Sequence, residues 1–156
     1  MLFLSTFINK IDKKGRVSVP SSFRALLMEK SFPGIIAYQS ISNECIESCS
    51  IERIQRLSES IDDMDPYSDE RDYLSTALFG LSEELKIDND GRVILSDALI
   101  DHAQIKDEVT FVGLGEKFQI WEPLKFESYL QQAQKKVKFF MNHAVLNANL
   151  PSVLFP

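Results

Sequence analysis

Alternating polar and apolar residues predict short strands on either side of a tight turn, and this arrangement occurs twice in the chain. In the first occurrence, residues 3–10 read as a strand, and residues 16–19 alternate polar and apolar side chains, which is typical of a half-buried strand. Between them, Gly15 follows three turn-forming residues and is expected to adopt a positive φ. The same order of strand, turn and strand is predicted for residues 85–87, 88–91 and 92–95.

Helices are predicted after both strand pairs. Pro20 suits a first helical turn and the serines after it suit the capping position, while Ser96 is an N-cap at the matching place in the second pair. Ser50 is expected to cap another helix, and the acidic residues 58–72 read as a connector or a polar helical excursion. Further strands are predicted at residues 35–38, 45–49, 109–112 and 117–121. A long helix is expected from about residue 124 to 146, with an apolar stripe of Phe126, Tyr129, Leu130, Ala133, Val137, Phe140, Met141 and Val145.

An internal repeat underlies the two strand pairs. Residues 10–17 and 86–93 are identical at six of eight positions, with an offset of 76. Such a repeat predicts two copies of one small unit. Each copy presents an Asp-x-x-Gly-Arg turn, and we expect the two copies to fold against each other or against other subunits, because each would be marginally stable alone.

The charged residues are distributed unevenly along the chain. The chain has 156 residues, 44% of them hydrophobic, and a net charge of −6, which by itself disfavours a nucleic-acid partner. Residues 1–30, however, carry six cationic and two acidic side chains, whereas residues 41–72 carry three and ten, and residues 83–110 carry three and eight. The first repeat is therefore a basic island in an acidic chain.

Several classes of function lack their sequence signals. Cys45 and Cys49 are the only cysteines, and with His102 and His143 they do not form a metal-ligand pattern, so we expect reduced thiols, no metal and no cofactor. We find no P-loop, dinucleotide-binding glycine pattern, GxSxG or HExxH, and we expect no enzyme activity. The apolar start is too short for a signal peptide and no run approaches the ~18 residues of a membrane span, so we expect a cytoplasmic protein without a membrane partner.

The Asp-x-x-Gly-Arg turns allow a structural and a functional interpretation. In the structural one, the aspartate binds nearby backbone N–H groups and pairs with the arginine. In the functional one, Arg16 and Arg92 contact phosphates or the O6/N7 edge of guanine, which match the donor geometry of a guanidinium. A strand-borne arginine beside a turn can enter a DNA groove, as in β-ribbon readers. Spacing alone leaves both interpretations open.

The chain resembles the MraZ family of bacterial transcriptional regulators. The matching residues are 11–24 in the first copy, 88–95 in the second, and then 109–113 and 118–121, so the resemblance covers nearly the whole chain. The two turns, their separation and the aromatic strand ending in Trp121 make the resemblance specific.

The resemblance implies an α+β fold of two tandem SpoVT/AbrB-like half-barrel repeats, related by a pseudo-two-fold and assembled into a homo-oligomeric ring. It implies sequence-specific binding to double-stranded DNA at short repeated promoter elements, in the cytoplasm and on the nucleoid, and control of the division and cell-wall gene cluster including its own promoter. The domains expected are repeat 1 at 7–54, an acidic helical connector at 55–82, repeat 2 at 83–126, and a C-terminal helix and tail at 127–156. The DNA-binding residues expected are Asp12, Lys13, Lys14, Gly15, Arg16, Asp88, Gly91 and Arg92, with secondary basic contacts from Lys10, Arg24 and Lys86.

The second copy departs from the first. It has Asn89 and Asp90 where the first copy has Lys13 and Lys14, and Ile100 takes the place of Arg24. We therefore expect the first turn to contribute more to DNA affinity than the second.

Two alternatives remain open from the sequence. The protein could be an AbrB/antitoxin-like interaction module that sequesters a partner protein through its segment after about residue 139. It could also be a ring scaffold without a DNA role, in which Arg16 and Arg92 form intersubunit salt bridges with the acidic region 59–72.

Overall fold

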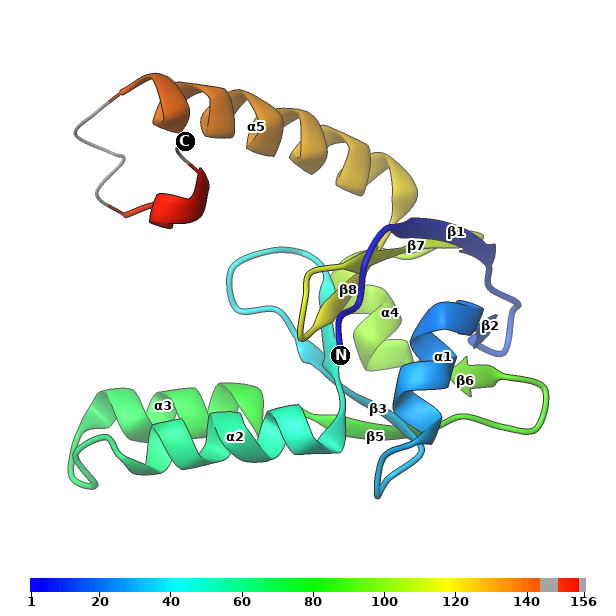
Figure 1. The fold of residues 1–156 in the computed structure, drawn as a ribbon. Helices are drawn as coiled ribbons and strands as arrows, with labels where there is room; N and C mark the ends of the chain where they lie inside the picture. The colour runs from blue at the N-terminus through cyan, green and yellow to red at the C-terminus, as the bar shows by residue number, and fades with distance from the viewer. Residues whose placement is uncertain (144–148, 155–156) are drawn as a thin grey trace. The chain divides into compact units, whose positions relative to one another are not determined.

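The computed structural model describes residues 1–143 and 149–154 of the chain, which divides into the units Met1–Pro123 and Leu124–Pro156. The first unit contains mixed helices and strands, and the second is dominated by one helix (Figure 1). The elements of the first unit are β1 (Thr6–Lys10), β2 (Arg16–Ser18), α1 (Ser21–Met28), β3 (Gly34–Gln39), β4 (Ile46–Cys49), α2 (Ile51–Asp62), α3 (Asp69–Leu78), β5 (Glu83–Lys86), β6 (Arg92–Ile94), α4 (Asp97–Ala103), β7 (Glu108–Gly113) and β8 (Phe118–Trp121).

The strands of the first unit exchange partners between the two copies of the repeat. Six strands form one antiparallel sheet in the order β1-β7-β8-β4-β3-β5, and β2 pairs with β6 in a separate two-stranded ribbon. The first copy contributes β1 to β4 and the second contributes β5 to β8, yet β1 pairs with β7 and β5 pairs with β3. The copies are therefore interlocked, and neither has a complete sheet of its own.

A local two-fold relationship runs through the strands that join the copies. At the centre of the ribbon, Val17 lies opposite Val93, its equivalent in the repeat. At the centre of the sheet, β4 of the first copy pairs with β8 of the second, and Glu47 lies opposite Gln119. Equivalent strands thus meet each other at two places, which explains why both turns come to the same end of the unit (Figure 1).

The main core lies between the sheet, the ribbon and helices α1 and α4. Phe23 of α1 is fully buried and packs edge-on against the rings of Phe3 and Phe7, with centroids 5.1 and 5.5 Å away. Burial of aromatic rings in such contacts contributes several kcal/mol each, of the order of 3–5 kcal/mol by truncation to alanine. The core also contains Val17 and Val93, so the ribbon is anchored by its inward-facing side chains.

A second, smaller core lies on the other face of the sheet. Ile36 and Tyr38 of β3 point away from the main core and are covered by the α2–α3 hairpin through Ile54, Ile61 and Leu78. The acidic segment predicted as a connector or helical excursion is therefore this helical hairpin. Its carboxylates lie mostly on the exposed side, and Arg71 pairs with Asp62 at 3.1 Å.

Two of the three predicted helix caps are confirmed. Ser50 accepts a hydrogen bond from Arg53 N, and Ser96 accepts one from Leu99 N. The cap expected from the serines after Pro20 is wrong, because Ser21 is already helical and Pro20 occupies the N-cap without a side-chain bond. Pro20 lacks a backbone N–H and its φ of −51° suits entry into a helix, so the helix begins there without a serine cap.

The second unit contains helix α5 (Pro123–Asn142) and a short 3-10 helix at Ser152–Leu154. The helix predicted over residues 124–146 begins where expected and ends at Asn142, and Val145 of the expected apolar stripe lies outside the described residues. None of the described helices has the length and apolarity required to cross a bilayer.

A buried polar chain marks the local two-fold axis in the sheet. The carboxylate of Glu47 is buried and accepts hydrogen bonds from Gln119 Nε2 at 3.0 and 3.2 Å and from Lys117 Nζ at 3.2 Å. Trp121 Nε1 donates to Gln119 Oε1 at 2.8 Å. Because equivalent strands meet here, a glutamate in both copies would place two carboxylates face to face, and the glutamine of the second copy avoids this repulsion.

We predict that Gln119→Glu lowers the free energy of unfolding by about 3 kcal/mol, because it buries a second carboxylate opposite Glu47. Urea unfolding followed by the fluorescence of Trp121, the single tryptophan, measures the change. Glu47→Gln is the matched control and should cost less than about 1.5 kcal/mol, since the partly exposed Lys117 remains solvated. Equal stability of Gln119→Glu and the wild type would contradict the role given to this pair.

Candidate nucleic-acid interface

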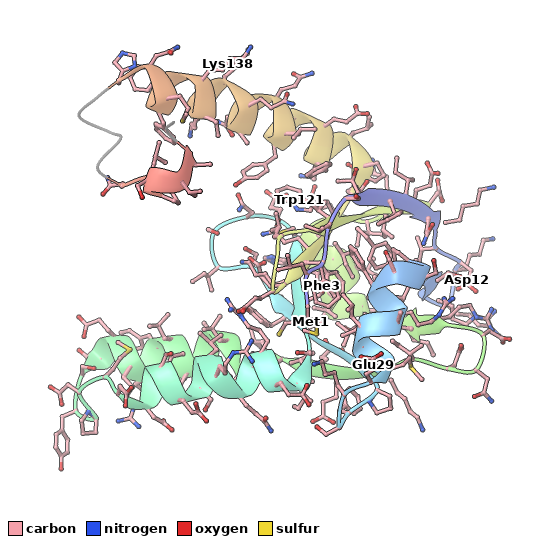
Figure 2. All side chains as sticks on the ribbon, viewed as in Figure 1. Met1, Phe3, Asp12, Glu29, Trp121 and Lys138 are labelled. Atoms are coloured by element: carbon pink, nitrogen blue, oxygen red, sulfur yellow. The ribbon has the colours of Figure 1, made fainter. Side chains whose placement is uncertain are left out.

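The turn after β1 is built around the side chain of Asp12. Its Oδ1 accepts hydrogen bonds from the backbone N–H groups of Lys14 at 2.9 Å and Arg16 at 3.0 Å. The backbone closes the same loop, with Asp12 N bonded to Arg16 O at 3.1 Å and Gly15 N bonded to Asp12 O at 3.0 Å. Gly15 has the predicted positive φ, of 82°. Figure 2 labels Asp12 at the surface beside helix α1, whereas Phe3 points into the core.

The turn after β5 repeats this geometry. Asp88 Oδ1 accepts from Asp90 N at 2.8 Å and from Arg92 N at 3.0 Å, and Gly91 has a φ of 76°. The sequence identity of the two turns therefore reflects one backbone structure, in which the aspartate replaces water at the N–H groups of the loop.

The two turns are tied to each other by backbone hydrogen bonds across the copies. Leu95 N, just after β6, donates to Gly15 O at 2.8 Å, and Val19 N, just after β2, donates to Gly91 O at 2.9 Å. Each glycine thus approaches the backbone of the other copy closely. A Cβ on Gly15 would overlap the carbonyl oxygen of Leu95, so this position excludes side chains for a second reason besides its dihedral angle.

Hydrogen bonding favours the ionised form of both aspartates. The pKa of Asp12 is lowered from its ordinary value of 3.8, mainly by the backbone N–H of Arg16 and further by its guanidinium. The pKa of Asp88 is lowered in the same way by the backbone N–H of Arg92. Both carboxylates are therefore charged near neutral pH and hold the arginines that follow them.

The arginines of the two turns share one exposed face of the β2–β6 ribbon. Arg16 lies directly opposite Ile94, and Ser18 lies directly opposite Arg92. Since side chains alternate along a strand, these four residues face one way, and Val17 and Val93 face the core. The side chains of Ser18 and Ile94 are exposed and those of the arginines are half-buried. The result is a two-stranded ribbon with one arginine near each end and a turn beside each of them.

The two arginines differ in how they are held. Arg16 Nε donates to Asp12 Oδ2 at 2.7 Å, and within the described residues its two terminal nitrogens make no hydrogen bond. Arg92 Nη2 binds Asp90 at 3.1 Å, and its Nε lies 3.6 Å from Asp88 Oδ2. In the first copy Lys14 stands where Asp90 stands in the second, so only Arg92 is drawn towards an additional carboxylate.

Arg24 lies beside the turn of the other copy. Its guanidinium packs against Gly91, at the place where a Cβ on that glycine would lie, and Nη1 donates to Val19 O at 3.1 Å. Ile100 of α4 takes the matching place beside Gly15. Arg24 belongs to the first copy in the sequence, and the interlocking of the copies places its guanidinium beside the turn of the second.

The remaining basic residues of the expected site are distributed unequally between the turns. Lys13 and Lys14 are exposed at the tip of the first turn. Lys10 and Lys86 are exposed at the ends of β1 and β5, opposite Glu108 and Gly34 respectively. Within the turns, residues 12–16 carry three cationic side chains and one carboxylate, whereas residues 88–92 carry one and two, with Arg24 packed beside them.

Nothing in the described part of the chain provides a metal site. Residues 1–143 and 149–154 contain no group of three or more His, Cys, Asp or Glu side chains placed to hold an ion. Cys45 and Cys49 are buried free thiols, and burial raises the pKa of Cys45 to about 12 and that of Cys49 to about 11. An open pocket of about 580 Å³ lies between α1 and the second turn, with Arg24, Met28 and Asp88 in its lining.

Comparison with known proteins gives a matching family model and several similar relatives. The family model described as "MraZ protein, putative antitoxin-like" matches residues 78–145. A transcriptional regulator MraZ of Rickettsia bellii is 54% identical over 135 residues, which cover 86% of this chain and 90% of the relative. Another, of Pelagibacter ubique, is 49% identical over 145 residues, covering 93% and 92%, and one of Rickettsia canadensis is 47% identical over 148 residues, covering 95% and 99%. The chain belongs to the MraZ family.

The similar proteins of the MraZ family are named transcriptional regulators, so the chain belongs to a family of transcriptional regulators. The structure brings the expected residues of the two turns to one end of its first unit. The sequence did not indicate two features of this MraZ-family site, namely Ile94 on the exposed face and the contact of Arg24 with Gly91. Polar–apolar alternation in residues 16–19 could have shown that Ser18 shares a face with Arg16, but pairing between the copies carries no local signal.

We predict that Gly15→Ala destabilises the protein more than Gly91→Ala does. Both substitutions cost about 1–2 kcal/mol of stability, because alanine disfavours a positive φ. Gly15→Ala must also displace the Leu95 backbone, whereas Gly91→Ala displaces only the end of a flexible arginine. Thermal unfolding of the single variants and of the Gly91→Ala/Arg24→Ala pair measures the difference. Arg24→Ala should reduce the effect of Gly91→Ala, and strict additivity of the two would refute the contact.

We also predict that Asp12 and Asp88 titrate with midpoints below 3.8. A lowered pKa means that the ionised carboxylates stabilise the folded turns above pH ~4 and that this contribution is lost as the pH falls through the folded midpoint. The side-chain carboxyl resonances in NMR report the titration. Arg16→Ala should raise the midpoint of Asp12 only part of the way, because the backbone donors remain, and should leave Asp88 unchanged.

Proposed function

We propose that this MraZ-family protein is a sequence-specific DNA-binding regulator that reads DNA with the exposed face of its β2–β6 ribbon. The observation that carries the proposal is the placement of Arg16 and Arg92 on one solvent-facing side of a two-stranded ribbon, with a turn beside each. A two-stranded ribbon fits the major groove of B-DNA, and arginine donates in a bidentate manner to O6 and N7 of guanine.

The structural pairing of arginine with aspartate supports this role. Asp12 holds the guanidinium of Arg16 through Nε, and the terminal nitrogens make no hydrogen bond within the described residues, so less side-chain entropy remains to be lost on binding. Lys13 and Lys14 lie at the tip of the same turn, where they would contact the phosphates that flank the groove. The arrangement thus separates base reading from backbone positioning.

The assembly and the targets follow from the family resemblance. A homo-oligomeric ring would present several ribbons to one DNA and favour operators made of short, regularly spaced repeats, because linked weak contacts gain effective concentration. The net charge of −6 is compatible with this, since exposed acids more than about 8–10 Å from the ribbon are screened at ordinary salt. The targets proposed are the division and cell-wall gene cluster and the protein's own promoter, in the cytoplasm and on the nucleoid.

The antitoxin-like wording of the matching family model supports a second candidate, a module that binds a protein partner. The remaining alternative, a scaffold in which the arginines bridge to the acidic region 59–72 of another subunit, receives less support. Arg16 is already engaged by a carboxylate of its own turn, and Asp62 of that region is paired with Arg71. The variants below separate the three functions.

We predict that Arg16→Ala weakens binding to the DNA upstream of this protein's gene at least ten-fold, within the about 1–3 kcal/mol range of a bidentate base contact. Arg92→Ala should weaken it less, because Arg92 Nη2 is held by Asp90 and the second turn has Asn89 and Asp90 where the first has two lysines. Fluorescence anisotropy at two salt concentrations, with a shuffled duplex for comparison, measures both effects. A larger loss for Arg92→Ala would refute the order of the two turns.

Matched variants in the two turns provide the controls. Lys14→Asp makes the first turn resemble the second and should lower affinity, whereas Asp90→Lys makes the second resemble the first and should raise it. Light scattering must show an unchanged particle size for each variant. Loss of assembly in both arginine variants would favour the scaffold, and intact particles that bind no DNA would favour a protein partner.

A further inference from the structure

An exposed apolar side chain belongs to the proposed DNA-reading face, at the end of the ribbon that carries Arg16. Ile94 is 59% exposed although it belongs to a strand whose other face is buried in the core. It is the direct cross-strand neighbour of Arg16. The fold of its own unit leaves this isoleucine largely exposed, so its side chain is available to a ligand.

The pseudo-symmetry of the ribbon shows that this feature is present in one copy only. Arg16 and Arg92 are equivalent in the repeat, and Ile94 is equivalent to Ser18. The pairing places Ile94 beside Arg16 and Ser18 beside Arg92. Each arginine therefore has a different cross-strand neighbour, which is apolar and branched for Arg16 and a small hydroxyl for Arg92.

From this difference we infer that Ile94 is a specificity-determining residue that contacts the 5-methyl group of a thymine next to the base read by Arg16. The inference rests on the proposed function and deepens it. In the major groove only the thymine methyl presents an apolar group, and it distinguishes thymine from the other bases. Ser18, beside Arg92, does not distinguish thymine from the other bases in this way, because its hydroxyl can both donate and accept hydrogen bonds. The two halves of the ribbon thus select different bases next to the ones that the arginines read, and the protein binds its DNA site in one orientation.

The stiffness of Ile94 suits this role. A β-branched side chain on a strand has few rotamers, so it loses little entropy when it is covered. Burial of one methyl group corresponds to roughly a four-fold change in affinity. The contact is therefore small beside that of an arginine, but large enough to set a preference at one base pair.

Replacement of thymine by deoxyuridine tests the inference with the wild-type protein, because it removes only the methyl group. Each thymine of the bound upstream duplex is replaced in turn, and affinity is measured by anisotropy. We expect one position per bound ribbon at which the wild type loses about four-fold and at which Ile94→Ser shows no loss. Ser18→Ile, the matched control, should keep that sensitive position and gain a second one beside the base read by Arg92.

The outcomes separate this inference from the proposed function. If the wild type binds the duplex in a manner that depends on Arg16, but wild type and Ile94→Ser respond alike to every replacement, the inference is wrong and the proposed function stands. If Ile94→Ser instead changes the particle size in light scattering while the deoxyuridine profile is kept, Ile94 contacts another copy of the chain and the inference is again wrong. Absence of specific DNA binding by the assembled wild type overturns both.

Discussion

The antiparallel pairing of β2 with β6 supports both turns of this protein. It joins two copies of one sequence unit around a local two-fold, with Val17 and Val93 at its centre and anchored in the core. Hydrogen bonds from Leu95 N to Gly15 O and from Val19 N to Gly91 O continue the pairing into the turns. Without it, neither turn would have its second support, and the exposed ribbon face would not exist.

The same local chemistry serves stability and recognition. An ionised aspartate collects two backbone N–H groups and one guanidinium, and this closes the turn and fixes the direction of the arginine. Because only Nε of Arg16 is used, its terminal nitrogens stay available within the described residues. The structural interpretation of the Asp-x-x-Gly-Arg motif and the DNA-binding interpretation are therefore compatible, since the first provides the preorganisation that the second needs.

Divergence between the copies has left a symmetric backbone with an asymmetric surface. Glu47 faces Gln119 on the axis of the sheet, where identical acidic residues would repel each other. At the turns, Lys14 corresponds to Asp90 and Arg24 corresponds to Ile100, and the exchange of strands places Arg24 against the more acidic turn. A duplicated unit can in this way keep one fold while its two halves acquire different charge and different contacts.

Local signals in the sequence predicted most of the elements and the shape of the turns. Polar–apolar alternation located the strands, serines located two of the helix caps, and the repeated glycines located the positive φ, because each of these signals depends on residues close together in the chain. The motif and the family resemblance also pointed to the residues of the proposed site.

The pairing of the strands is a property of the tertiary structure, and it determines which side chains lie together at the site. Strand exchange moved Arg24 to the turn of the other copy and placed Ile94 beside Arg16. The limits of the local signals show in the start of α1, where proline alone occupies the N-cap. Pairing between segments 76 residues apart is set by complementary burial and backbone hydrogen bonds across the whole sheet, and no local pattern encodes it.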